Sequence, residues 1–437
     1  MPGRSARLWA AAAALMVAGT LLCETARADS PSPLTAAQQP ADWWFTFKFN
    51  GAKFPGCAAQ AVRACPFGGT PNASYAHWSQ QYAVASRASG ATKALQAGPN
   101  CLGDSAQDPV GATFGQIYNG TLHYVIWNDQ FYDDPKIAGC TKECGSPWGH
   151  SKGVLAWDDD GNGVVMQGTT PAWPISGGPE KESGSNGNSL GCTSDNNVQF
   201  SQHYFSLKLT VDDVAAVLQA MIDAGVVTAP DKDHPQIYNP GGPDRLTSLL
   251  PLLGNKSPAP TKVPYPYPVK LSSGVLLIAK QSRMHVPPWQ MISSVLGGVD
   301  LRTATWSQVS PVMGSTTRTT PIACWDDLLT NKPGAVEVAT TGNFNSVIFG
   351  LTGANSPNSA DHNHAKFGVT TAPGSTLTIL GDMNQQGTLS GANCASSQNG
   401  RGGLFFVVND AALHDSVAAL LQGDTAPLDP SDPASGK

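Results

Sequence analysis

Two segments of the chain end in the same pattern, and this constrains the fold more than any other feature. The first segment reads YFSLKLTVDDVAAVLQAMIDAG and the second reads LFFVVNDAALHDSVAALLQG, each a strand-like run followed by a helix-like run. In the first, Thr210 with Asp213 forms a capping pattern and Gly225 is placed to end the helix. In the second, Asn409 is a candidate N-cap and Gly423 a candidate stop. The repetition predicts an internal duplication.

Each of these segments lies downstream of a His-x-Lys motif. Of nine histidines, only His150 and His364 are followed two residues later by lysine, at Lys152 and Lys366. An apolar run precedes each motif, YVIW in the first case and SVIFGL in the second. Residues i and i+2 of a strand point to the same side, so each motif on a strand presents an imidazole and an ammonium group together. We predict that each copy donates one histidine and one lysine to a shared site.

A stretch rich in proline separates the two copies. Residues 228–268 contain ten prolines and little periodicity, which is typical of a connection. The predicted organisation is a signal peptide at 1–28, an N-terminal half at 29–227, the connection at 228–268, a C-terminal half at 269–425 and a disordered tail at 426–437.

Local patterns in the first half predict several elements. ADWWFTFKFN at 41–50 and TLHYVIWND at 121–129 read as strands, and a helical piece is expected near Tyr75–Ala88. GVLAW and GVVMQ flank Asp158–Gly163 as a hairpin. The DDDGNG sequence at that turn also resembles the start of a calcium loop. Thr169 stands where an EF-hand needs its last ligand, so the turn is the favoured interpretation.

The N-terminus predicts export. Arg4 and Arg7 precede an apolar stretch and a small-x-small site at 26–28, the pattern of a secretory signal peptide. Cleavage after Ala28 would leave 437 − 28 = 409 residues. Eight of the nine cysteines would remain, which suggests disulfides of unspecified connectivity in a secreted or periplasmic protein. No later segment is long and apolar enough to predict a membrane span.

The charge balance limits the partners. Net charge is −6 and only 13% of residues are charged, which argues against broad electrostatic binding of nucleic acid. A local cluster of cations must therefore supply any contact with a polyanion.

Two histidines and two lysines brought together suit phosphoryl transfer. One neutral imidazole can attack phosphorus while the other, protonated, gives a proton to the leaving oxygen, and ordinary histidine titrates where both states coexist. The lysines can hold the non-bridging oxygens. This set requires no metal or other cofactor.

The duplicated His-x-Lys pattern resembles the phospholipase D superfamily, and more specifically the deoxyribonuclease II family. The matching stretches run from about residue 41 to 410 and are ADWWFTFKF, LHYVIWNDQ, GHSKGVLAWDDDGNGVVM, DHNHAKFGV, GDMNQQG and GRGG. The resemblance implies an α/β fold of two similar phospholipase D-like halves, each a mixed sheet flanked by helices, related by a pseudo-dyad. It also implies metal-independent endonucleolysis of DNA through a phosphohistidine intermediate, leaving 3′-phosphate ends.

The superfamily signature places an aspartate four residues after each lysine, where this chain has Ala156 and Thr370. The orienting groups must therefore lie elsewhere. Asp382 and Asn384 of GDMN are the candidates, with Asp382 expected to accept a hydrogen bond from the His364 ring. Gln167 and Thr169 occupy the corresponding place in the first half. The predicted catalytic set comprises His150 as nucleophile, His364 as general acid, and Lys152, Lys366, Asp382 and Asn384.

Several other residues allow two interpretations, one functional and one structural, or two different functions. Asp361, His362 and His364 could instead ligate a metal. Arg401, Gly402 and Gly403 could bind phosphate through backbone N–H groups or form a plain loop. Four tryptophans could stack on bases but are more commonly core residues: Trp43, Trp44, Trp127 and Trp148.

The first choice is thus an exported DNA endonuclease. A metal-dependent secreted phosphodiesterase and a catalytically inactive binding protein of the same fold are the alternatives. The expected partner is DNA, without a membrane, and a homodimer is one option.

Overall fold

A computed structural model describes thirteen stretches of the chain, which together contain both His-x-Lys motifs. They are 30–50, 81–99, 102–103, 106–119, 122–133, 135–140, 142–173, 190, 200–231, 233–256, 268–306, 313–353 and 362–435. The predicted signal peptide and four of the eight remaining cysteines (57, 65, 101 and 192) lie outside these residues. Among the helices in these stretches, none is long and apolar enough to cross a membrane.

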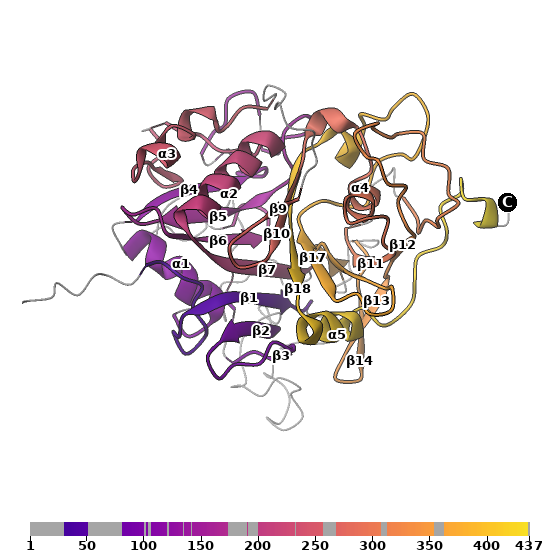
Figure 1. Cartoon of the computed structure of the whole chain (residues 1–437), viewed down its shortest axis with the longest axis horizontal. Coiled ribbons are helices and arrows are strands. Elements are labelled where there is room, and N and C mark those ends of the chain that lie inside the picture. Colours follow the sequence, from indigo (N-terminus) through magenta and orange to yellow (C-terminus); the bar gives the residue numbers. More distant parts are fainter. Residues whose placement is uncertain are drawn as a thin grey trace, which may run out of the picture.

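The strands of the first half form a single sheet (Figure 1). In sheet order they are β3 (Gln96–Ala97), β2 (Tyr82–Ala88), β1 (Ala41–Lys48), β7 (Phe200–Leu209), β6 (Gly163–Gly168), β5 (Lys152–Trp157), β4 (His123–Asn128) and β8 (Tyr238–Asn239). A short strand of the second half, β15 (His362–Asn363), joins this sheet beside the start of β7. The helices of this half are α1 (Pro109–Asn119) and α2 (Val211–Ala224). The stretch predicted as a connection, 228–268, contributes β8 to the sheet and also contains α3 (Asp244–Thr247) and the 3₁₀ turn η2 (Leu250–Leu252).

A second sheet contains most strands of the C-terminal half. Its order is β12 (Val336–Val338), β11 (Leu301–Ala304), β16 (Phe367–Thr370), β17 (Leu377–Gly381), β18 (Gly403–Asn409), β10 (Leu276–Lys280) and β9 (Val269–Lys270). A separate hairpin pairs β13 (Thr341–Phe344) with β14 (Val347–Gly350). The helices are α4 (Pro288–Val295) and α5 (Ala411–Leu420), with 3₁₀ turns η3 (Ser282–Met284), η4 (Ser397–Gly400) and η5 (Pro433–Ser435).

Five adjacent strands follow the same antiparallel order in both sheets. The first sheet contains β1-β7-β6-β5-β4 and the second contains β10-β18-β17-β16-β11. In each set of five, the strand that comes first in the sequence (β1 or β10) pairs with the one that comes last (β7 or β18), and the last leads directly into a helix, α2 or α5. Register extends the match to side chains, because Lys48 and Lys280 fall at equivalent ladder positions and both are buried.

The two sheets share one hydrophobic core. The largest cluster of buried side chains includes residues of both halves, and aromatic pairs join the sheets directly. Phe45 lies 6.0 Å from Phe367, and Phe205 lies 5.5 Å from Phe406, between ring centroids. Helix α2 contacts β10 and β18 of the second sheet. The halves are therefore packed as one body, with β15 crossing between them.

Helix α2 confirms the capping prediction. The Thr210 hydroxyl accepts a hydrogen bond from the Asp213 N–H, the Asp213 carboxylate accepts one from the Thr210 N–H, and Gly225 ends the helix with φ +60°. The hairpin around Asp158–Gly163 is also confirmed, because β5 pairs with β6 across that turn. The Asp158 side chain accepts hydrogen bonds from the N–H groups of Asp160 and Asn162, as a turn requires.

Four local predictions are wrong. Of the stretch expected to be helical, residues 75–80 lie outside the described residues, and Tyr82–Ala88 is a strand because it pairs with β1 and β3, so that tertiary pairing overrides the local composition. Asp410, not Asn409, caps α5, and that helix ends at Leu420 rather than at Gly423. The tail is ordered over residues 426–435. Ser315 pairs with Leu428, and the buried Asp432 carboxylate accepts a hydrogen bond from Thr317 at 2.6 Å.

Replacing Thr210 by alanine should lower the free energy of unfolding by about 1 kcal/mol, because the hydroxyl that accepts from the Asp213 N–H and donates to the Asp213 carboxylate is lost. Urea denaturation followed by circular dichroism measures the change. Thr371→Ala is the matched control, since its side chain is exposed, and should shift the value by less than about 0.5 kcal/mol. Equal effects of the two substitutions would contradict the capping role.

Candidate active site

Both His-x-Lys motifs lie at strand starts rather than within strands. Lys152 is the first residue of β5, so His150 precedes the strand. Lys366 directly precedes β16, and His364 lies between β15 and β16. The prediction that each motif is wholly on a strand is therefore wrong. Leaving the strand frees the histidine backbone to pair with the other half of the molecule.

Each histidine backbone donates a hydrogen bond to the opposite half. The His150 N–H donates to the Gly402 carbonyl at 2.8 Å, and the His364 N–H donates to the Ser201 carbonyl at 2.8 Å. The two acceptors are equivalent in the ladders. Gly168 and Gly381 are the last residues of β6 and β17, and they pair with Tyr204 and Phe405. Ser201 lies three residues before Tyr204, and Gly402 lies three residues before Phe405, so the two acceptors hold the same position in their sheets.

The imidazole rings repeat this exchange. Nδ1 of His150 contacts the backbone carbonyl of Asp382, and Nδ1 of His364 contacts the backbone carbonyl of Thr169 at 2.7 Å. Continuing each register by one pair places Lys152 opposite Gly168 and Lys366 opposite Gly381, so Thr169 and Asp382 are also equivalent. A carbonyl only accepts, so each Nδ1 carries the proton and each Nε2 carries the lone pair.

Lys366 also lies 3.2 Å from Nδ1 of His364. An ammonium group only donates, and a protonated Nδ1 cannot accept, so the contacts with Lys366 and Thr169 cannot both be hydrogen bonds for one tautomer. The shorter contact with Thr169 fixes the ring. The prediction that the Asp382 carboxylate accepts from His364 is wrong in this arrangement.

The Asp382 carboxylate instead lies between the two lysines. Its two oxygens are each 3.9 Å from an ammonium nitrogen, one of Lys152 and one of Lys366. Neither oxygen accepts a hydrogen bond from any residue that the structure describes. Burial raises the pKa of Asp382 to about 7, although both lysines oppose the shift. Asp382 thus brings the lysines of the two motifs to one place.

Burial sets the protonation of the other groups. It lowers the pKa of Lys366 to about 7, with Asp382 opposing the shift. Burial also lowers the pKa of both histidines well below the usual value. The nearest lysine adds to this in each case, and Asp129 opposes it at His150. Each histidine is affected by the lysine of the opposite motif as well, which indicates that the two motifs are close together.

Asp129 is the contact that sequence reasoning missed. It follows β4 and is buried, with one carboxylate oxygen 2.6 Å from Lys152 and the other 2.8 Å from Arg401 and 3.9 Å from His150. Burial opposes its ionisation, but Lys152, His150 and Arg401 outweigh burial and hold its pKa below the usual value. The only sequence signal was its place at the end of a strand adjoining a motif strand.

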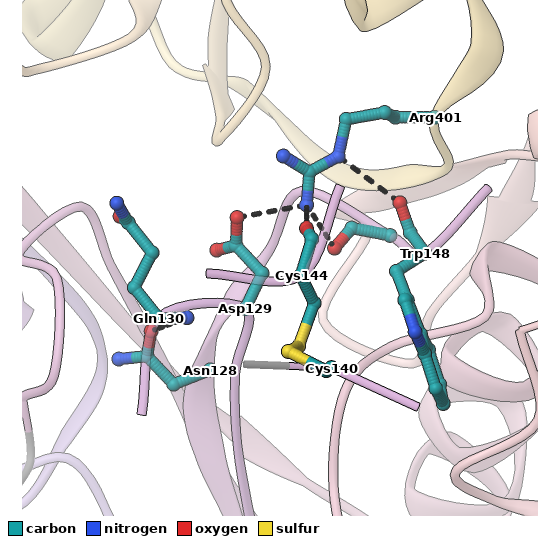
Figure 2. The surroundings of a disulfide bond; sticks show 8 residues. Asn128, Asp129, Gln130, Cys140, Cys144, Trp148 and Arg401 are labelled. Atoms are coloured by element: carbon teal, nitrogen blue, oxygen red, sulfur yellow. Dashed lines mark hydrogen bonds and ion pairs between the residues drawn. A yellow bond between two sulfur atoms is a disulfide. The ribbon is translucent and has the colours of Figure 1, made fainter. Parts of the chain in front are cut away.

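The Arg401 side chain, rather than the backbone N–H groups of its loop, joins the site. Figure 2 shows its guanidinium pointing from the second half toward Asp129. It also donates to the backbone carbonyls of Cys144, Trp148 and Gly149. These carbonyls belong to the loop between β4 and β5, which also contains the Cys140–Cys144 disulfide. The Cys144 N–H donates to the Asp129 carbonyl at 2.8 Å.

Two glycines allow the segments to meet at this point. A Cβ on Gly149 would lie 2.7 Å from the Ala224 carbonyl oxygen, and one on Gly402 would lie 2.0 Å from the same atom. Real side chains do not tolerate such distances. The close packing of both segments against the end of α2 therefore requires glycine at both positions.

Other predicted residues lie near the site without joining the cluster. Asn384 hydrogen-bonds through its amide to Gln386 at 2.9 Å, and Gln167 donates to the Leu404 carbonyl at 3.1 Å. His362 is buried in β15 against Phe200, with ring centroids 5.0 Å apart. Asp361 lies outside the described residues. The four tryptophans proposed for base stacking are all buried core residues: Trp43, Trp44, Trp127 and Trp148.

Within the described part of the chain, no group of three or more His, Cys, Asp or Glu side chains is placed to bind a metal ion. The site is instead a largely buried set of two imidazoles, two ammonium groups, one guanidinium and two carboxylates, in which His364 and Arg401 are partly exposed. Such a set can hold an anion and transfer protons.

Comparison with known proteins agrees with this chemistry. No significant match is found among curated proteins. The family model described as Deoxyribonuclease II matches residues 32–423 of the 437, a range that includes both motifs, Asp129 and Arg401. The chain therefore belongs to the deoxyribonuclease II family of DNA hydrolases.

Proposed function

We propose that the protein is an exported endonuclease that hydrolyses DNA through a phosphohistidine intermediate, without a metal, and leaves 3′-phosphate ends. The observation that best supports this is the reciprocal holding of the two histidines. Each Nδ1 is engaged by a carbonyl of the opposite half, which leaves each Nε2 free for chemistry. The matched strand orders and ladder positions support a pseudo-dyad relating the two halves about this site.

The proposed reaction begins with attack of the His150 Nε2 lone pair on phosphorus. The P–O5′ bond breaks as the P–N bond forms, and His364 gives its Nε2 proton to the leaving oxygen. Water then attacks phosphorus, His364 takes a proton from it, and the P–N bond breaks to release the 3′-phosphate. Burial and the lysines keep both rings neutral in the empty site. The bound phosphate anion raises the pKa of His364, so that it can act as the acid.

The cations have separate tasks in this proposal. Lys366 has no carboxylate within hydrogen-bonding distance, so its ammonium group can hold a non-bridging oxygen. Lys152 is bound to Asp129 at 2.6 Å, which fixes its position beside His150. Asp382 separates the two ammonium groups and reduces their repulsion. Asn384 remains a proposed member of the site through its place two residues after Asp382.

Export is part of the same proposal. The pattern of residues 1–28 supports a signal peptide, and the Cys140–Cys144 and Cys324–Cys394 disulfides support a secreted or periplasmic location. A homodimer remains a prediction to be tested by sedimentation.

Plasmid cleavage should continue in excess EDTA, because the two histidines and two lysines provide nucleophile, acid and charge. Gel electrophoresis of plasmid incubated with and without chelator measures this. A known metal-dependent deoxyribonuclease in parallel samples shows that chelation is complete. Loss of cleavage with recovery on adding a divalent ion would favour the metal-dependent phosphodiesterase.

Replacing either His150 or His364 by alanine should reduce cleavage of DNA by at least about a hundredfold, because nucleophile or acid is lost. A thymidine 3′-(4-nitrophenyl phosphate) substrate separates the roles, since its leaving group needs no proton. The His364→Ala variant should accumulate phosphorylated His150, detected by mass spectrometry, and His150→Ala should form none.

The half-buried His234, outside the site, provides the control, and His234→Ala should retain activity. Reversed labelling would exchange the two roles. Full activity in both site variants would exclude the motifs as the active site.

The value of kcat/KM should fall at low pH, well below 6.5, and its fall at alkaline pH should steepen near pH 7, because the deprotonation of Lys366 is then added to that of the acid His364 in the free enzyme. Lys366 has its pKa lowered to about 7, so its ammonium form predominates below that pH and is lost above it. The attacking histidine has its pKa lowered well below 6.5, so it stays neutral until the pH is low. Lys366→Arg should remove the steepening of the alkaline limb near pH 7, because arginine stays charged.

Initial rates across a pH series measure both limbs, and exposed Lys208 provides the control through Lys208→Arg. An alkaline limb that is the same in Lys366→Arg and wild type would assign that titration to another group.

A further inference from the structure

The two histidines differ in the residue that lies beside each ring. The strand that begins at or just after each motif lysine has a neighbour that comes earlier in the sequence, β4 for β5 and β11 for β16. Across these pairs, Asn128 lies opposite Lys152 and Ala304 lies opposite Phe367, the residue after Lys366. Continuing the second register by one pair places Thr305 opposite Lys366. Asp129 in the first half and Trp306 in the second are therefore equivalent positions. A carboxylate adjoins His150 where an indole adjoins His364.

Trp306 belongs to a small aromatic group around His364. The ring centroids of Trp306 and His364 are 5.1 Å apart, with the planes at 81°. Phe200 lies 5.5 Å from Trp306 at 33°, and 6.2 Å from His364 at 74°. Trp306 and Phe200 are thus tilted by 33° relative to each other, and both are roughly perpendicular to the imidazole. All three side chains are partly exposed, unlike the buried tryptophans of the core.

The surroundings of His150 cannot accept a nucleoside in the same way. Asp129, Lys152 and the His150 ring are buried, and the Asp129 carboxylate is already engaged by Lys152 and Arg401. Aromatic faces stack on any nucleobase, and they do so without a fixed pattern of hydrogen bonds. The aromatic group at His364 is therefore the place where a base next to the reacting phosphate finds an apolar surface.

We propose that Trp306, together with Phe200, forms a stacking subsite for the nucleoside that leaves with the 5′-hydroxyl. This inference rests on the proposed function, in which His364 protonates that hydroxyl. In-line attack places the leaving oxygen on the side opposite His150, so its nucleoside lies on the His364 side. Because stacking tolerates every base, the subsite orients DNA without selecting a sequence.

An oligothymidylate with one tetrahydrofuran abasic residue tests the subsite, either single-stranded or paired with oligodeoxyadenylate. The strand is end-labelled, and the cleavage at each bond is read on a gel. The wild-type enzyme should cut the bond on the 5′ side of the abasic residue at least roughly fivefold less than ordinary bonds, because the leaving nucleoside then has no base. The bond on its 3′ side should be cut at the ordinary rate.

The Trp306→Ala variant should cut ordinary bonds at least roughly fivefold more slowly and should cut the two bonds flanking the abasic residue equally. Trp306→Phe should retain part of the discrimination. Trp325 is a half-buried tryptophan packed against a separate buried cluster of the second half that includes Trp289 and Phe405, and it provides the control, since Trp325→Ala should keep the wild-type pattern.

Two results would overturn the subsite. One is discrimination that persists in Trp306→Ala, and the other is discrimination at the bond on the 3′ side of the abasic residue. A uniform loss of rate in Trp306→Ala, with no discrimination in the wild type, would show that Trp306 only positions His364. The proposed function fails separately, if wild-type protein leaves ordinary oligonucleotide uncut or yields ends without a 3′-phosphate.

Discussion

The buried carboxylate of Asp129 is the contact on which the alignment of the two halves depends. A charge in the protein interior is tolerated only when it is paired and hydrogen-bonded, and Asp129 finds one partner in each half. Lys152 comes from its own sheet, and Arg401 comes from the loop between β17 and β18 of the other. Movement of either half would leave an unpaired ion, so this ion pair favours a single relative position. Figure 2 shows that the Arg401 guanidinium, beside the Cys140–Cys144 disulfide, also donates to the backbone carbonyls of Cys144 and Trp148.

Around this ion pair, the hydrogen bonds of the two histidines form a matched exchange. The backbone and ring of each histidine both bind carbonyls of the opposite half. Backbone carbonyls cannot titrate, so they hold the same ring tautomer at every working pH. The side chains around the site can then diverge, as Asp129 and Trp306 have done, without loss of ring orientation. Symmetric holding with asymmetric neighbours is what a reaction with one nucleophile and one acid requires.

The features predicted correctly from the sequence are those that depend on residues close together along the chain. The capping box of α2, the hairpin at Asp158–Gly163 and the His-x-Lys pairs all follow from spacing within a few residues. The site residues that were not predicted depend on contacts between distant parts of the chain. Asp129, the Arg401 side chain and Trp306 acquire their places from strand register and from contacts between the halves. Asp382 and Thr169 were named from the sequence as orienting residues, but their use of backbone carbonyls, each toward the histidine of the opposite half, was not predicted, because any residue supplies a carbonyl.

The position of β18 in its sheet has a consequence for biosynthesis. It is the last strand in the sequence, yet it lies between β17 and β10, so the second sheet stays split until residues 403–409 are available. Gly402 and Arg401, which contact His150 and Asp129, directly precede it. A nascent chain therefore lacks both contacts during almost all of its synthesis. With the proposed function, a nuclease assembled in this order stays inactive until its chain is nearly complete. It therefore cannot cut nucleic acid in the compartment where it is translated while synthesis is under way.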